Sequence, residues 1–122
     1  IGSANIIDGS IANDAAGNTT RFVSDQGLSL DLTTPASGKV SLIFRPQNTF
    51  LLGDQDTVDN GIRLSGHIVY REFLGSLIRY GIDVQGHLLS VDEMHSIGKT
   101  HRNVNDKVSL GVCHDQAVVV NQ

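Results

Sequence analysis

The stretch Gly66–Val91, GHIVYREFLGSLIRYGIDVQGHLLSV, alternates apolar and polar residues on both sides of Leu74-Gly75-Ser76. A period of two residues places successive side chains on opposite faces of a strand, so this pattern predicts a ribbon of long strands. Gly and Ser are favoured in turns, and we expect the chain to bend at Gly75 and to turn again at Gln85-Gly86. None of the usual catalytic residue sets lies on the ribbon, so its role must come from its surfaces.

In the rest of the chain, turn-forming Gly, Asn or Asp residues recur at intervals of about eight to twelve residues. Runs rich in Ile, Val, Leu and Thr lie between them and predict short strands in a sandwich or barrel. No stretch has a sustained helical period, so we expect little helix beyond a short turn within Asp92–Asn105. The expected strands are Ile7–Ala12, Thr19–Ser24, Leu28–Leu32, Lys39–Arg45, Asn48–Leu52, Ile62–Glu72, Ser76–Val84, His87–Val91, Asp106–Val112 and Ala117–Val120.

The two halves of the chain resemble each other, and such internal similarity predicts a repeated structural unit. The matched segments are Asp8–Ile11 with Ser65–Ile68, Gly38–Leu42 with Asp106–Leu110, and Phe50–Leu52 with Val118–Val120. We therefore predict an all-β fold of two small, barrel-like units in tandem with about five strands each, at residues 1–53 and 62–122, joined by a linker at 54–61. Units this small rarely close a core alone, so they should pack on each other or on a second chain.

Charge and composition argue against several classes of function. The formal net charge is −4, which disfavours a nucleic-acid surface because such surfaces need a basic patch. No segment approaches the roughly 18 apolar residues of a membrane-spanning helix, so we expect no direct insertion into a membrane. The single cysteine, Cys113, has no partner for an internal disulfide, which fits a reducing cytoplasm.

The chain lacks a residue set that predicts catalysis, a cofactor or a metal site. Gly98-Lys99-Thr100 has the end of a phosphate-binding loop, but Glu93 stands where that loop requires its first Gly. His67 and His87 can face each other across the ribbon as a pair for a metal or a pH switch, although half-buried strand histidines are far commoner. We therefore expect no enzyme activity and no bound cofactor in this sequence.

Several short motifs occur in the order found in one family of transport proteins. They are Ile1–Asn5, Phe44-Arg45-Pro46-Gln47, Leu74-Gly75 and Asn105–Leu110. With them the chain resembles the C-terminal regulatory region of ATP-binding subunits from bacterial ABC importers, the region that carries the transport-associated OB fold, or TOBE domain. Among these importers it is most similar to the ferric-iron, polyamine and phosphonate groups. It departs from the family pattern at Gln47, where Glu is usual, and at Asn105, where Gly is usual.

The resemblance implies a regulatory and dimerisation domain for solute import that is not itself catalytic. It implies an ATPase domain upstream of Ile1, which would hold ATP and Mg²⁺ and contact the membrane subunits of the transporter. It also implies a homodimer of ATP-binding subunits in the cytoplasm, at the inner face of the plasma membrane. The expected interface residues are Ile68, Tyr70, Phe73, Leu77, Ile78 and Tyr80, of which the alternation places about half in the core.

A second function stays open, because related TOBE folds bind oxyanions such as molybdate. An anion site needs N–H groups, small residues and a cation. The candidate contacts are Ser3, Asn5, Ser76 and Arg79. A third reading, an OB-type nucleic-acid binder, requires a basic groove with stacking aromatic residues, and the net acidity disfavours it.

Overall fold

The computed structural model describes residues 3–13, 20–53, 55–98 and 101–122 of the chain. Residues of the sequence analysis that lie outside these ranges are Ile1, Gly2, Thr19, Asp54, Lys99 and Thr100. The strands are β1 (Asn5–Asn13), β2 (Thr20–Ser24), β3 (Ser29–Leu32), β4 (Lys39–Phe44), β5 (Thr49–Leu52), β6 (Gly61–Leu74), β7 (Leu77–Val84), β8 (His87–Met94), β9 (Lys107–Cys113) and β10 (Ala117–Asn121). Two short 3₁₀ turns accompany them, η1 (Pro46–Asn48) and η2 (His114–Gln116).

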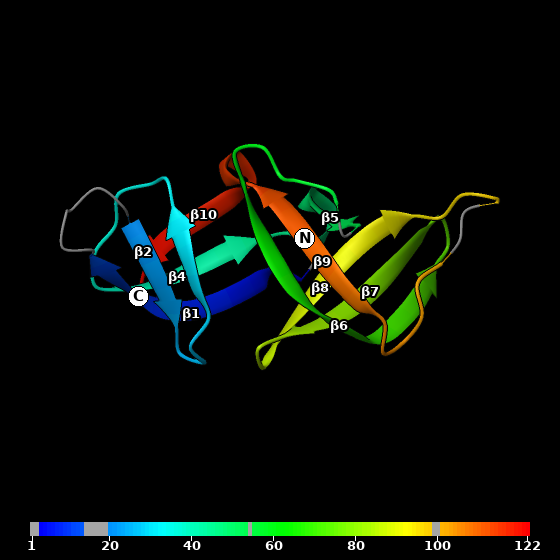
Figure 1. The fold of residues 1–122 in the computed structure, drawn as a ribbon, viewed down its shortest axis with the longest axis horizontal. Helices are drawn as coiled ribbons and strands as arrows, with labels where there is room; N and C mark the ends of the chain where they lie inside the picture. Colours follow the sequence, from blue (N-terminus) through cyan, green and yellow to red (C-terminus); the bar gives the residue numbers. More distant parts are fainter. Residues whose placement is uncertain (1–2, 14–19, 54, 99–100) are drawn as a thin grey trace.

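The strands form two antiparallel five-stranded sheets, in the orders β10-β4-β1-β2-β3 and β5-β9-β6-β7-β8. Figure 1 shows them as two lobes side by side, with the red strand β10 in the blue and cyan lobe. β5 comes from the first half of the chain but pairs with β9, and β10 comes from the second half but pairs with β4. Each half therefore donates its last strand to the other sheet, and the sheets cross the sequence boundaries drawn at residues 53 and 62.

The strand pairs of the two sheets have matching registers when the two halves are aligned by the sequence repeat. The matched cross-strand pairs are Ala117–Phe44 with Thr49–Val112, and Gly9–Val40 with Gly66–Val108. These pairs have the offsets of the repeated segments, so the similarity between the halves is a structural repeat. The prediction of an all-β, OB-like fold with two similar five-stranded units is confirmed.

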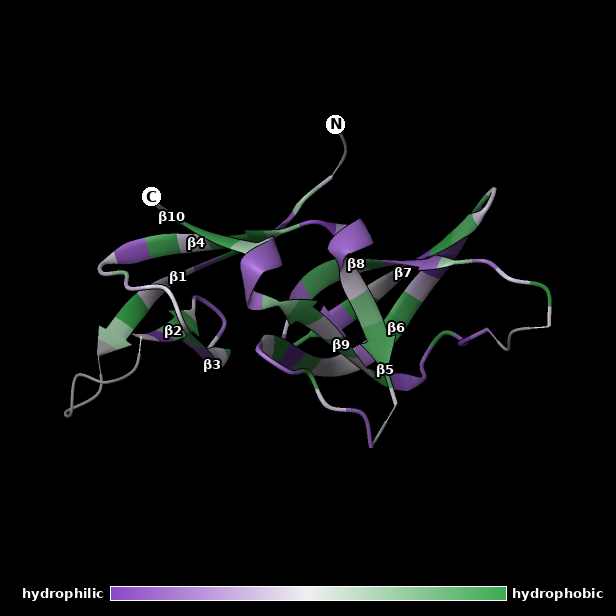
Figure 2. Cartoon of the chain, turned by 90° about the horizontal axis from the view of Figure 1, so that it is seen from above, coloured by the Kyte–Doolittle hydropathy of each residue, from purple (hydrophilic) through white to green (hydrophobic). Residues whose placement is uncertain are grey.

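The two 3₁₀ turns lie where the chain changes sheet. η1 leads from β4 of the first sheet to β5 of the second, and η2 leads from β9 back to β10. Pro46 occupies the first turn of η1, where its missing N–H has no intrahelical acceptor to lose. Both turns are coloured as hydrophilic in Figure 2. Pro46 thus ends the fourth strand, as the sequence predicts.

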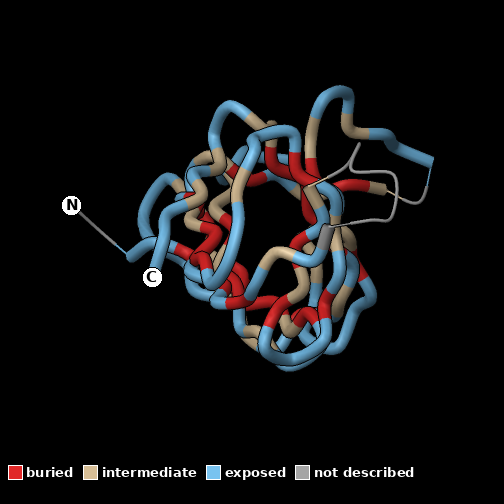
Figure 3. Tube along the Cα trace, turned by 90° about the vertical axis from the view of Figure 1, so that its left-hand side faces the viewer, coloured by how far each residue is buried: buried red, intermediate tan, exposed pale blue. Residues whose placement is uncertain are grey.

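Buried apolar side chains form one continuous cluster that runs through both sheets. Tyr80, Phe22 and Phe44 are its largest members, with exposed fractions of 0%, 0% and 1%. Figure 3 shows the buried residues lining the inside of the sheets, while loops and turns are exposed. In the second sheet β5 also packs against β8, which brings the outer strands together. The two units therefore share a core, as their small size predicts.

Among the described residues, three hydrogen bonds that involve side chains link the two sheets. The Asn5 amide donates to the carbonyl oxygen of Ser90 at 2.9 Å and accepts from its N–H at 2.8 Å. His87 Nε2 lies 2.8 Å from Ser24 Oγ. Asn5 and Ser24 belong to the first sheet, whereas Ser90 and His87 belong to β8 of the second. These contacts fix β8 against β1 and β2.

The opening ribbon becomes β6, β7 and β8, joined by two tight turns. Gly75 has φ +67° in the first turn, and Gln85 and Gly86 have φ +49° and +89° in the second. These left-handed conformations suit Gly, and both predicted turns are confirmed. Several strand ends differ from the prediction by one to three residues, most at β8, which continues to Met94. The described part of residues 92–105 contains no helical turn.

Candidate functional site

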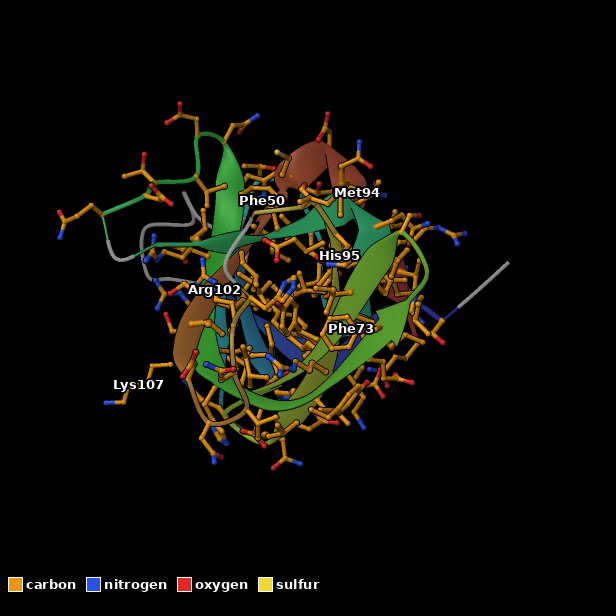
Figure 4. The ribbon with its side chains drawn as sticks, turned by 90° about the vertical axis from the view of Figure 1, so that its right-hand side faces the viewer. Phe50, Phe73, Met94, His95, Arg102 and Lys107 are labelled. Atoms are coloured by element: carbon orange, nitrogen blue, oxygen red, sulfur yellow. The ribbon has the colours of Figure 1, made fainter. Side chains whose placement is uncertain are left out.

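An open hollow of about 590 Å³ lies on the outer face of the second sheet, over β6 and β9. Its lining residues are Ser65, Gly66, His67, Asn105, Lys107, Val108 and Ser109, and we call it the Lys107 hollow. Gly66 lies between Ser65 and His67 on β6, where a Cβ would overlap the carbonyl oxygen of Asp83 on the neighbouring strand. Lys107 is exposed, and Figure 4 shows its side chain extending away from the strands.

Hydrogen-bond donors converge on this hollow from two adjacent strands. Ser65 lies opposite Ser109, and His67 lies opposite Lys107. Side chains of such cross-strand pairs stand on the same face of the sheet. The two serine hydroxyls are 2.9 Å apart, and either can donate to the other. One hydroxyl hydrogen of the pair therefore stays available, and the Lys107 ammonium adds three donors and a positive charge.

Asn105 borders the hollow from the loop that enters β9. Its φ is +77°, and its backbone N–H donates to the carbonyl oxygen of Ile68 at 2.7 Å. Asn tolerates this left-handed conformation better than most residues. The hydrogen bond fixes the loop backbone beside the bulge in β6 that follows Ile68. The loop is therefore held in place at the rim of the Lys107 hollow.

The nearest carboxylates are engaged in their own turns. Asp83 lies opposite His67 on β7, and its Oδ1 accepts from the N–H of Gly86 at 3.1 Å. Asp106 Oδ2 accepts from the N–H of Asn103 at 2.9 Å. Within the described part of the chain, neither acid forms an ion pair with Lys107. Its ammonium is therefore free to attract an anion.

The structural repeat supplies a comparison site on the first sheet. The positions matched to Ser65, His67, Lys107 and Ser109 are Asp8, Ser10, Lys39 and Ser41. There Ser41 Oγ donates to Asp8 Oδ1 at 2.6 Å, so the hydroxyl is occupied and a carboxylate sits on the face. The second sheet has a hydroxyl in place of that carboxylate. Of the two matched faces, the one at Lys107 is therefore suited to an anion.

The predicted anion contacts do not form one site. The Asn5 amide is used in both directions by Ser90. Arg79 makes a bidentate pair with Asp92 at 2.7 and 2.9 Å, and this hydrogen bonding raises the pKa of its guanidinium. Ser3 precedes β1, while Ser76 lies exposed in the turn after β6. The amide of Asn5 and the guanidinium of Arg79 are therefore engaged in internal contacts.

The six predicted interface residues divide between core and surface. Ile68, Ile78 and Tyr80 have exposed fractions of 0%, 1% and 0%, so they cannot contact a partner in this fold. Phe73 is 54% exposed, and Tyr70 and Leu77 are half-buried. Tyr70 packs its ring over Gly81, where a Cβ would overlap it. The predicted interface residues that remain accessible are Tyr70, Phe73 and Leu77, on the β6–β7 hairpin.

The sequence left open whether His67 and His87 face each other across the ribbon. His67 lies opposite Asp83 and His87 bonds Ser24, so these two do not pair across the ribbon. Among the described residues, no group of three or more His, Cys, Asp or Glu could hold a metal ion. None of the described helical segments is long and apolar enough to span a membrane.

No protein-family model matches the sequence, and no curated protein matches it. The fold is similar to that of ModG. A crystal structure of this cytoplasmic molybdate-binding protein, with molybdate bound, covers 100% of the present chain and 99% of its own, with a TM-score of 0.80. The sequences are 13% identical, so the likeness establishes a shared TOBE-like fold. This solved structure spans both units with their exchanged strands.

Sequence reasoning missed the Lys107 hollow, although a usable signal was present. Except for Asn105, its lining residues fall within the repeated segments Ser65–Ile68 and Asp106–Leu110. The informative feature is a difference between the copies, Asp8 in the first and Ser65 in the second. Comparing the charge at matched positions would have pointed to this face.

Proposed function

We propose that this domain is a non-catalytic module that binds a small tetrahedral oxyanion at the Lys107 hollow. The observation that carries the proposal is the position of Lys107 on the same face as two bonded serine hydroxyls, with no ion pair to a described carboxylate. An ammonium with neutral donors is the chemistry that recognises molybdate, tungstate, sulfate or phosphate. The shared fold with a molybdate-binding protein supports this class of ligand.

Calorimetric titration of the complete chain with these four anions tests the proposal. We expect saturable binding that weakens as ionic strength rises, because the site is exposed and its attraction is screened. Lys107→Ala should weaken binding by about tenfold, which corresponds to the loss of one charge-assisted hydrogen bond. If none of the four anions produces a heat change on titration, the proposed anion-binding function is wrong.

The first sheet supplies the matched controls. Ser65→Asp places a carboxylate where Asp8 stands in the other copy, so it should abolish anion binding while leaving the fold unchanged. Lys39→Ala removes the equivalent lysine beside Asp8 and should leave binding unaltered. An equal loss from Lys39→Ala and Lys107→Ala would show general attraction by net charge and would contradict the assigned site.

We further propose that the tip of the β6–β7 hairpin is an association surface for a second copy of the protein. Phe73 and Leu74 are 54% and 44% exposed, and Met94, which lies opposite Leu77 at the end of β8, is 66% exposed. Apolar residues grouped in this way are typical of protein interfaces. The resemblance to regulatory regions of ABC importers supports a homodimer and a role in solute import without catalysis by this domain.

Sedimentation velocity at micromolar concentration tests this second function. We expect a dimer that dissociates in Phe73→Ser, because the change removes exposed apolar area without altering the core. Val118→Ser, at a similarly exposed position on β10, is the matched control and should remain dimeric. A monomer at all concentrations would rule out self-association at this tip without affecting the anion test.

A further inference from the structure

Two histidines meet at the far end of the second sheet, outside the Lys107 hollow. The ring centroids of His95 and His101 are 4.9 Å apart, with an angle of 49° between the ring planes. His95 follows β8, and His101 lies in the loop that leads to β9. Figure 4 shows His95 and Phe73 at the end of the molecule that faces the viewer. We propose that His95 and His101 together bind one divalent transition-metal ion.

The spacing of the rings fits a shared ion. An imidazole nitrogen binds Zn²⁺ at about 2.0–2.1 Å, so two rings on one ion at square or tetrahedral angles have centroids roughly 4.5–5.2 Å apart. The observed 4.9 Å lies within this interval. Rotation of an imidazole about χ2 has a broad energy profile, so the nitrogens can turn toward a common point at little cost. His95 is exposed and His101 half-buried, which gives an ion access from solvent.

Hydrogen bonds hold the backbone near both histidines in place. The N–H of His95 donates to the carbonyl oxygen of Ser76 at 2.8 Å. Beyond His101, the N–H of Arg102 donates to Tyr80 Oη at 3.2 Å, and the carbonyl oxygen of Arg102 accepts from Arg71 at 2.7 Å. Tyr80 is fully buried, so the loop is anchored to the core. This anchoring limits the entropy lost when an ion binds.

Phe73 orients the pair from one side. Its ring meets His95 edge-on at a centroid distance of 6.0 Å and His101 at 5.5 Å. Arg71 lies over the same Phe73 ring at 5.5 Å, so its charge is directed to the aromatic face. The two imidazoles therefore lie together beside an apolar support.

The ligand set determines which metals are expected. Imidazole suits Zn²⁺, Cu²⁺ and Ni²⁺, whereas Mg²⁺ and Ca²⁺ prefer oxygen ligands. Two protein ligands leave the remaining coordination positions to water or to a group from another molecule. The site should therefore bind reversibly, with Cu²⁺ tighter than Ni²⁺ in accord with the usual affinity order. This inference is independent of the proposed oxyanion function.

The test uses the complete chain without a histidine tag. Calorimetric titration with Ni²⁺ should give one saturable site, and Cu²⁺ should give an electron paramagnetic resonance spectrum with splitting from two nitrogens. His95→Phe and His101→Phe retain an aromatic ring against Phe73 while removing the ligand atoms. Each should weaken Ni²⁺ binding by more than about tenfold and remove one nitrogen from the Cu²⁺ spectrum.

Controls separate this pair from the other histidines. His67→Phe and His114→Phe alter exposed or half-buried rings elsewhere and should leave the affinity for Ni²⁺ unchanged. Anion binding at the Lys107 hollow should persist in His95→Phe, which distinguishes failure at one site from failure at the other. Absence of saturable binding, or undiminished binding in the double variant His95→Phe with His101→Phe, would overturn the proposal.

Discussion

The outer faces of the two sheets differ at matched positions, although the strands beneath them have the same order and register. On the first sheet Asp8 accepts a hydrogen bond from Ser41, whereas on the second Ser65 and Ser109 share one beside Lys107. Register is constrained because a one-residue slip would turn every core side chain outward. A solvent-facing residue has no such constraint. The two sheets therefore keep the same strand arrangement, while the residues on their outer faces can differ.

The strand pairs β2–β3 and β7–β8 differ in the burial and geometry of an ion pair that each carries. Each carries an Arg–Asp pair across its strands, Arg21 with Asp31 and Arg79 with Asp92. The first has exposed side-chain fractions of 48% and 57%, the second 28% and 10%. The better-buried pair is also bidentate, so the same residue types should contribute unequally to stability.

The largest effect should follow truncation of the shared core. Phe22 of the first sheet and Ile82 of the second are both fully buried, and replacing either by Ala should cost about 2–5 kcal/mol in the free energy of unfolding. Because each sheet contains a strand from the other half, either change should lower a single, common transition. Urea unfolding followed by circular dichroism and by tyrosine fluorescence measures this.

The milder Phe22→Leu keeps the test valid if Phe22→Ala fails to fold, with a cost of about 1 kcal/mol. Both tyrosines belong to the second sheet, so their fluorescence reports on that sheet alone. Separate transitions by the two methods would show that the sheets unfold independently and would break the shared-core comparison.

Much of this architecture could be predicted because strands leave a local signal. A two-residue period identifies Lys39–Phe44 or Leu77–Val84 without knowledge of any partner strand. The exchange of β5 and β10 has no such signal, because pairing depends on contacts between residues far apart in the chain. η1 and η2 were missed since three residues are too few to show a period. The role of Arg79 depends on Asp92, which reaches it only across the β7–β8 turn.

A smaller effect is expected from matched glycines that let strands approach closely. A Cβ at Gly9 would overlap the carbonyl oxygen of Val23, and one at Gly66 would overlap that of Asp83. Gly9→Ala and Gly66→Ala should each cost about 1–3 kcal/mol by overpacking, measured by thermal unfolding. Similar losses at both would show that the repeat keeps the same close approach in each sheet.

Gly75 provides the contrasting control because its neighbourhood is open and only its φ of +67° is demanding. Gly75→Ala should cost on the order of 1 kcal/mol, and Gly75→Asn less, since Asn tolerates the left-handed region. If Asn and Ala were equally harmful at position 75, backbone conformation would not be the cause.

The contact between Asn5 of the first sheet and Ser90 of the second should contribute an intermediate amount to the free energy of unfolding. Asn5 is 5% exposed, and its matched position in the second sheet is occupied by buried Ile62. Asn5→Ala removes both hydrogen bonds to Ser90 and should cost about 1–3 kcal/mol. Hydrogen exchange at the Ser90 amide should accelerate more than exchange at core amides of β7. Unchanged exchange at Ser90 would mean that this contact does not hold β8 against β1.

The smallest changes in stability are expected from breaking the two Arg–Asp pairs, and the two changes should differ in size. Arg21→Gln should cost less than about 0.5 kcal/mol, because an exposed pair gains little in water. Arg79→Gln should cost about 1 kcal/mol, since it breaks a partly buried bidentate contact. Added salt should reduce the contribution of Arg21 more than that of Arg79.

The contribution of Arg79 to stability should not change between neutral and mildly alkaline pH. The hydrogen bond to Asp92 raises the pKa of Arg79, so this contribution is present below the ordinary arginine pKa and is lost only above it. Urea titrations of both variants at pH 6 and pH 9 should therefore give the same Arg79 cost, and a fall at pH 9 would contradict a persistently charged pair.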